Sequence, residues 1–153
     1  MLKSKIDFDR MCDIMSKWNW NELKLGLEKS IISNNDVISY AVFILSENIE
    51  QFDKVLELSI AAEDEVEKII LQLSSNELVQ DFEKINSKWV FAIIYYAYIN
   101  SMDMIYDVIE DVYTEFGYPE EISNLIEYMP CNDRRPIDVK LNEYIETYKN
   151  IWN

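Results

Sequence analysis

The sequence predicts an all-α protein that folds as a single domain of about eight antiparallel helices over residues 1–153. Apolar residues recur at helical spacing along almost the whole chain, whereas no sustained alternation of apolar and polar residues indicates a strand. Only two glycines and three prolines interrupt this pattern, and no repeat, low-complexity tract or linker divides it. A length of 153 residues and a hydrophobic content of 49% are sufficient for one core, despite a net charge of -15.

The N-terminal half contains several stretches with apolar residues on one helical face. The first begins at Trp20, where Asn19 and Glu22 have the spacing of a capping box. The second follows the polar cluster Asn34-Asn35-Asp36, which we expect to cap a helix over residues 37–45. Further apolar stripes predict helices within residues 52–60, 66–73 and, as the shortest of the three, 78–85.

The C-terminal half begins with the most apolar helix expected in the chain. Asn86 or Ser87 opens it, and it stays apolar on nearly every side through Ile99, as is typical of a buried helix. An amphipathic helix is expected over residues 102–116, with Gly117 at the position of a helix C-cap. Its expected apolar stripe consists of Met102, Ile105, Tyr106, Ile109, Val112, Tyr113 and Phe116. The remaining prediction is a short helix from Pro119 to about Met129, a loop over Pro130–Pro136 and a final helix whose apolar face runs from Leu141 to Trp152.

The charged residues are unevenly distributed. Residues 1–33 carry six basic and five acidic side chains, whereas residues 89–133 contain nine acids and no Lys or Arg. A second acidic block, residues 47–67, holds eight acids and one base, Lys54. Such a field repels nucleic acid and anionic membranes and attracts basic proteins. The alternative is that the acidity only keeps the protein soluble.

The composition excludes most familiar catalytic and metal sites. Without histidine, a Ser or Cys nucleophile lacks its usual base, and the common zinc and di-iron ligand sets cannot form. Gly-rich phosphate loops and the EF-hand calcium loop are also missing. We therefore expect no enzyme activity, catalytic residue, cofactor or metal, and rank an enzyme that uses carboxylates alone last.

Three features predict a cytoplasmic protein. The longest apolar run, Trp89 to Ile99, is shorter than the roughly 20 residues that span a bilayer. The N-terminus shows neither the apolar region nor the cleavage site of an export signal. Cys12 and Cys131 are far apart in sequence, and we expect both to be reduced thiols.

The clearest polar pattern is a ladder of carboxylates on the helix expected at residues 102–116. Asp103, Asp107, Asp111 and Glu115 stand four residues apart and so lie on one face of the helix, with Glu110 beside them. Like charges at this spacing lower the stability of a helix when no basic residues lie between them. We expect this strip, extended by two following acids, to bind basic side chains of a partner, unless it is only a solvated face. Tyrosines beside these carboxylates, although mostly expected in the core, are candidate interface anchors. The predicted partner-binding residues are Asp103, Asp107, Glu110, Asp111, Glu115, Glu120 and Glu121.

Several segments resemble the bacterial domain of unknown function 2247 family. The most specific are Phe116-Gly117-Tyr118-Pro119-Glu120-Glu121-Ile122 and Tyr128-Met129-Pro130, accompanied by Trp20-Asn21-Glu22-Leu23, Gly26-Leu27-Glu28, Tyr40-Ala41, Leu45 and Lys88-Trp89. The resemblance covers nearly the whole chain. It implies a small cytosolic bacterial protein without known enzyme activity, whose relatives are proposed immunity proteins of polymorphic toxin systems. It carries over no catalytic residues.

These observations favour an immunity protein that binds and neutralises a cognate toxin domain. The expected partner is a basic protein, most plausibly a nuclease domain, and not a nucleic acid or a membrane. An acidic surface can occupy a basic substrate site by presenting carboxylates in place of phosphates. The alternative is a helical adaptor or regulatory module that binds a basic peptide or protein. The identity of the toxin, the mode of blockade and the oligomeric state stay open.

Overall fold

The computed structural model describes residues 2–78, 81–127 and 133–152. These residues form eight α-helices and three 3-10 helices, with no strand among them, which confirms the all-α prediction. The chain divides into two compact units, one of Ile6–Ile85 and one of Met1–Lys5 with Asn86–Asn153. Each unit is described by itself, and the single domain over residues 1–153 stays a prediction. No described helix is long and apolar enough to cross a membrane.

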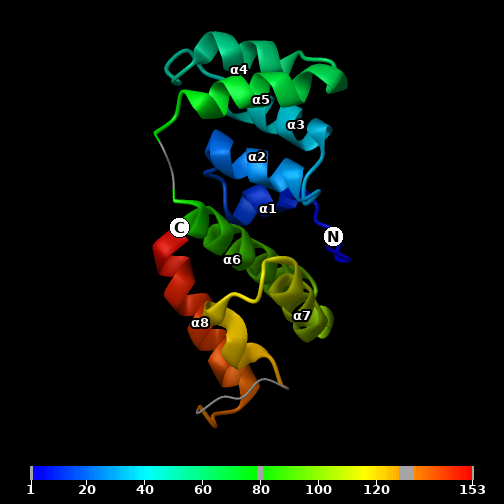
Figure 1. Ribbon diagram of the computed structural model, residues 1–153, viewed down its shortest axis with the longest axis vertical. Coiled ribbons are helices and arrows are strands. Elements are labelled where there is room, and N and C mark those ends of the chain that lie inside the picture. Colours follow the sequence, from blue (N-terminus) through cyan, green and yellow to red (C-terminus); the bar gives the residue numbers. More distant parts are fainter. Residues whose placement is uncertain (1, 79–80, 128–132, 153) are drawn as a thin grey trace. The chain divides into compact units, whose positions relative to one another are not determined.

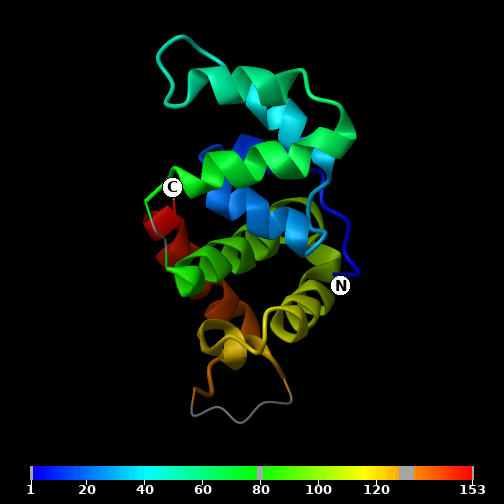
Figure 2. The same ribbon diagram turned by 45° about the horizontal axis from the view of Figure 1, so that its top comes forward.

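The first unit contains five short helices, shown in blue to green in Figures 1 and 2. Helix α3 packs against α1, α4 and α5, while α5 also packs against α2 and α4. Leu23, Val37, Leu58 and Leu73 are fully buried in this unit. The helices are α1 (Phe8–Ile14), α2 (Trp20–Glu28), α3 (Asn34–Ile44), α4 (Phe52–Ser59) and α5 (Val66–Ser75), with the 3-10 helix η1 (Glu63–Glu65) before α5.

Helix ends in this unit are closed by side chains. Asn19 and Glu22 form the capping box that the sequence predicts, with Glu22 N–H to Asn19 Oδ1 at 2.8 Å. The N-cap of α3 is Ser33 and not a residue of the cluster Asn34-Asn35-Asp36. Asp36 is the third residue of the helix, and its side chain accepts the backbone N–H of Ser33 in a second capping box. Glu77 accepts the backbone N–H groups of Trp20 at 2.9 Å and Asn21 at 2.8 Å, which favourably places a carboxylate at the N-terminus of α2.

The second unit contains most of a long apolar helix, α6 (Phe82–Asn100), from Asn86 onwards, and the helix residues Trp89–Tyr95 are all buried. This burial confirms the buried helix predicted there. Helix α6 is followed by the 3-10 helix η2 (Met102–Met104), α7 (Ile105–Glu115), the 3-10 helix η3 (Glu120–Leu125) and α8 (Ile137–Trp152). The helix η3 packs against both α7 and α8.

Two predicted boundaries in this part of the chain are wrong. Of the helix expected at residues 78–85, residues 79–80 lie outside the described part, and residues 82–85 belong to α6, which begins at Phe82 and not at Asn86 or Ser87. Asp81 supplies the earlier start: its carboxylate accepts the Glu83 N–H at 2.9 Å, and its carbonyl accepts the Ile85 N–H at 3.2 Å. Leu78, expected on an apolar stripe, is 88% exposed.

The end of α7 follows the predicted pattern. Gly117 has φ +74°, and the Tyr118 N–H bonds to the Tyr113 carbonyl at 2.8 Å, the long bond of a Schellman motif. The rings of Tyr113 and Tyr118 then meet edge to face at 5.3 Å. The next helix differs from its prediction: it is the 3-10 helix η3, with Pro119 as its N-cap, and Met129 lies outside the described residues.

Candidate interaction surface

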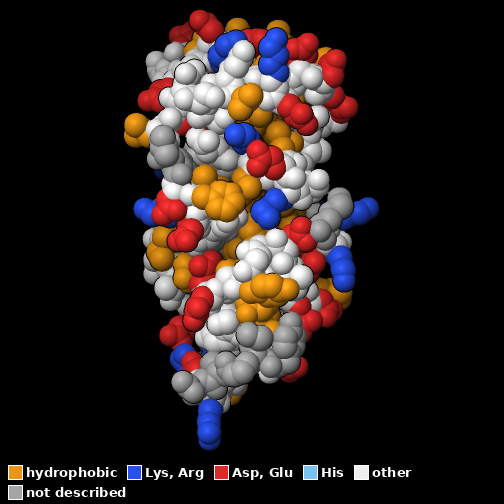
Figure 3. Space-filling model, viewed as in Figure 1, with side chains coloured by type: hydrophobic (Ala, Val, Ile, Leu, Met, Phe, Trp, Pro, Cys, Tyr) orange, Lys and Arg blue, Asp and Glu red, His pale blue; other side chains and the backbone are white. Residues whose placement is uncertain are grey.

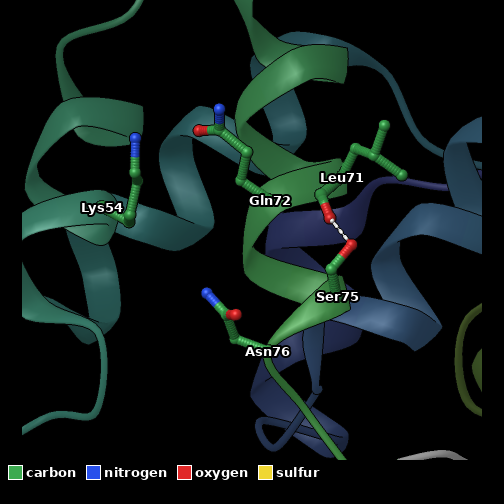
Figure 4. Close-up of a pocket in the computed structure, with 5 residues that line it drawn as sticks. All are labelled: Lys54, Leu71, Gln72, Ser75 and Asn76. Atoms are coloured by element: carbon green, nitrogen blue, oxygen red, sulfur yellow. Dashed lines mark hydrogen bonds between the residues drawn. The ribbon is translucent and has the colours of Figure 1, made fainter.

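No group of three or more Cys, Asp or Glu side chains is arranged to hold a metal ion in the described part of the chain. An open hollow of about 440 Å³ lies beside α4 and α5, lined by Lys54, Leu71, Gln72, Ser75 and Asn76 (Figure 4). The Ser75 hydroxyl donates to the Leu71 carbonyl at 2.6 Å, and Lys54 Nζ lies 3.1 Å from a Glu57 carboxylate oxygen. Ser75 and Lys54 are therefore engaged within their own helices, while the Asn76 side chain donates to Gln51 Oε1 at 3.0 Å.

All seven acids predicted to bind a partner belong to the second unit. Asp103 lies on η2, and the two last acids, Glu120 and Glu121, lie on η3. The remaining four, Asp107, Glu110, Asp111 and Glu115, lie on α7, whose other face is buried through Ile105, Val108, Ile109, Val112 and Tyr113. The structure thus places the seven on three consecutive elements of one unit, η2, α7 and η3.

The outward face of α7 is rotated relative to the predicted ladder. Asp103, Asp107 and Glu110 are exposed, whereas Asp111 and Glu115 are only partly exposed. The rotation follows from the buried positions, which include both Val112 and Phe116. Asp111 and Glu115 directly precede these two residues and therefore lie closer to the interior. With Glu120, which is also exposed, four of the seven predicted side chains face solvent fully. Figure 3 shows acidic side chains spread over the visible face with hydrophobic ones among them.

Asp111 binds a distant segment of its own chain. Its Oδ2 accepts the backbone N–H groups of Lys3 at 2.8 Å and Ser4 at 3.4 Å. Two such bonds to a carboxylate hold the N-terminal segment against α7. We therefore assign Asp111 a structural contact within the unit.

Glu121 is turned towards α6 and α8. Burial raises the pKa of its carboxyl group, and a hydrogen bond from the Ser87 side chain opposes that rise. Burial also raises the pKa of Tyr144 and Tyr148, and the negative charge of Glu121 adds to both shifts. A half-buried carboxyl among these side chains is less available to a partner than Glu120, its exposed neighbour.

Exposed apolar side chains surround the turn from α6 into α7. Ile99 and Met104 are each 49% exposed and Met102 is 47% exposed. The prediction that Met102 and Tyr106 belong to the buried stripe of α7 is wrong, since both are exposed. The reason is that Met102 precedes the α-helix, in η2, and that Tyr106 follows the first buried position, Ile105.

The second acidic block and the loop noted in the sequence differ from this surface. The block at residues 47–67 lies in the first unit, where η1 exposes Glu63, Asp64 and Glu65. In the loop Pro130–Pro136, residues 130–132 lie outside the described part. Asp133 and Arg135 form an ion pair that lowers the pKa of Asp133 to about 2, and Arg135 also contacts Glu143.

Cys12 is a free thiol, whereas Cys131 lies outside the described residues. Partial burial raises the pKa of the Cys12 thiol to about 12, and the charges of Asp9 and Asp13 add to the rise. Because its pKa is this high, Cys12 stays protonated at neutral pH. The protonated thiol is the unreactive form of cysteine. This agrees with the prediction that it is reduced.

The sequence pattern of one bacterial family matches residues 8–152. That family is described as an uncharacterized protein conserved in bacteria, DUF2247. No curated protein and no solved structure shows significant similarity to the chain. Because the match covers almost the entire sequence, the chain belongs to the DUF2247 family, as its FGYPEEI and YMP segments suggested.

Proposed function

We propose that this member of the DUF2247 family is an immunity protein that binds a basic toxin domain and neutralises it. The observation that carries the proposal is the acidic face of the second unit. Asp103, Asp107, Glu110 and Glu120 are exposed there, in a 45-residue stretch, 89–133, that contains no Lys or Arg. We call these four residues the acidic face.

The acidic face is suited to a basic protein partner. No ion pair within the described residues neutralises its four carboxylates, so their charge is directed at solvent. Opposite charge on a partner then accelerates association, while an approaching nucleic acid or anionic membrane is repelled. A toxin that acts on nucleic acid needs a basic substrate site, which carboxylates can occupy in place of phosphates.

The proposed function is one of binding and not of catalysis. Inhibition through binding requires no reactive group, only complementary charge and apolar anchors. A helical adaptor for a basic peptide remains the alternative that the experiment must separate from this proposal.

Growth of a heterologous bacterium tests the proposal. The bacterium expresses the C-terminal fragment of the large protein encoded immediately upstream, with this protein, with an unrelated acidic helical protein or with neither. We expect the fragment to arrest growth and only this protein to restore it. A fragment that is harmless, or that arrests growth equally in all three strains, would contradict the immunity function and favour the adaptor.

A further inference from the structure

Four exposed apolar residues lie at the turn from α6 into α7. Ile99 lies in the last turn of α6, Met102 and Met104 lie on η2, and Tyr106 lies in the first turn of α7. We call these four apolar residues the corner surface.

Acidic side chains border the corner surface. Asp103 lies between Met102 and Met104, and Asp107 follows Tyr106. Both carboxylates are exposed. A second copy of the chain would bring like charges together at this surface, which disfavours self-association. A partner that covers it must therefore combine apolar side chains with positive charge.

The methionine and tyrosine residues of the corner surface are of types that are suited to binding a partner. Methionine has three rotatable bonds and a polarizable sulfur, so its side chain adapts to different partner shapes. Tyrosine is enriched among the residues that contribute most to interface affinity. Isolated exposed apolar residues are ordinary, but several contiguous ones with a charged rim are typical of interaction sites.

We infer that the corner surface binds the apolar side of a basic amphipathic segment of the partner, whose Lys and Arg side chains pair with Asp103 and Asp107. The inference rests on the proposed function when the partner is the toxin domain, and it names the part of the interface that slows dissociation. The exposed carboxylates accelerate association, while Met102, Met104 and Tyr106 anchor the bound segment.

Two synthetic peptides test the surface without a toxin. One is a Lys/Leu amphipathic helix of about five turns, and the other is an oligolysine of the same charge. Their affinities are measured by calorimetry for the wild type, for Met102→Gln with Met104→Gln, and for a matched control, Leu56→Gln with Leu71→Gln. The control replaces exposed apolar residues of α4 and α5 in the first unit. Circular dichroism checks that all three proteins keep their helicity.

We expect the Met102→Gln, Met104→Gln variant to bind the amphipathic peptide about tenfold more weakly than the wild type does. Its affinity for oligolysine should stay within about twofold, because the carboxylates are unchanged. The control variant should match the wild type with both peptides. Equal loss in the two variants, or no loss in the methionine variant, would overturn the inference.

The growth assay separates the failure of this inference from that of the proposed function. If the wild type restores growth and the methionine variant restores it equally at low expression, the corner surface is not the anchor. If the wild type binds the amphipathic peptide at the corner surface but never restores growth, the immunity function fails and the surface belongs to an adaptor.

Discussion

Tyr40 and Tyr144 are buried tyrosines of the first and the second unit, but their hydroxyl groups have different surroundings. The Tyr40 hydroxyl accepts the Trp18 N–H at 3.1 Å and donates to the Trp18 carbonyl at 3.0 Å. The Tyr144 hydroxyl has no hydrogen-bond partner among the described residues, nor do Asn86 Oδ1 and Trp152 Nε1. Buried polar groups are normally paired, so the second unit is less well satisfied than the first.

The two rings themselves have similar surroundings. Phe8, Trp18 and Trp20 lie around Tyr40, with ring centroids of Phe8 and Trp20 each 6.1 Å from it. Phe91 and Tyr148 lie near Tyr144, with ring centroids 6.0 Å and 4.7 Å from it. The two sites therefore differ in the hydrogen bonds of their hydroxyl groups and not in the aromatic packing around them.

Large-to-small substitutions in the two interiors should have the largest effects. Leu58 in α4 and Ile109 in α7 are both fully buried, so replacing either by Ala leaves a cavity. We expect a loss of about 2–5 kcal/mol in the free energy of unfolding for each variant. Urea denaturation measures it, with the exposed neighbours Leu56→Ala and Ile99→Ala as controls expected to change little. A small effect at Leu58 or Ile109 would show that its unit is loosely packed.

Removal of the two tyrosine hydroxyls tests the difference between the units directly. Tyr40→Phe leaves the Trp18 N–H and carbonyl without their partner, which should cost about 1–2 kcal/mol of stability. Tyr144→Phe removes a hydroxyl that has no partner among the described residues, so we expect no loss, or a gain of up to about 1 kcal/mol. Thermal unfolding of both variants is the measurement. A comparable loss in both would remove the contrast between the units.

The pH dependence of Glu121 is the smallest effect expected. Because burial raises the pKa of its carboxyl group in the folded state, Glu121 stabilises the fold below the ordinary carboxyl pKa. That contribution is lost as the pH rises through the raised pKa. The Glu121→Gln variant should therefore be more stable than the wild type at neutral pH, by about 0.5 kcal/mol or less.

This advantage of Glu121→Gln should shrink as the pH is lowered towards about 4, where the wild-type carboxyl group becomes protonated. Denaturation at a series of pH values measures it. Glu120→Gln, which removes the same charge from an exposed neighbour, corrects for the general effect of net charge. An identical pH profile for both variants would show that Glu121 is not buried in solution.

Local signals explain which parts of the fold were predictable. The capping box at Asn19 and the left-handed Gly117 depend on residues within one helical turn, and both are present as expected. Helix α1 escaped prediction because it is only seven residues long and its buried apolar residues are just Phe8 and Met11. The early start of α6 depends on Asp81, whose capping role is masked by the apolar pattern on both sides.

The candidate site was predictable in location but not in detail. The absence of Lys and Arg from residues 89–133 identifies the acidic region from composition alone. Asp111 bonds to backbone atoms of Lys3 and Ser4, 108 and 107 residues away, and Glu121 is half-buried beside α6 and α8. Such long-range contacts leave no signature in helical periodicity. The exposure of Met102 and Tyr106 likewise depends on where the 3-10 helix ends and α7 begins.

Binding of the toxic fragment to two matched charge-reversal variants tests the central claim most directly. One variant carries Asp103→Lys, Asp107→Lys and Glu110→Lys in the second unit, and the other carries Asp53→Lys, Glu57→Lys and Glu67→Lys in the first. Both change the net charge equally, so association rates at low and high salt separate a local contact from the overall field. We predict that the first variant associates at least about tenfold more slowly at low salt and loses most of its salt dependence, while the second stays close to the wild type. An equal effect of the two variants, or a larger effect of the second, would contradict the assignment of the partner surface to the acidic face.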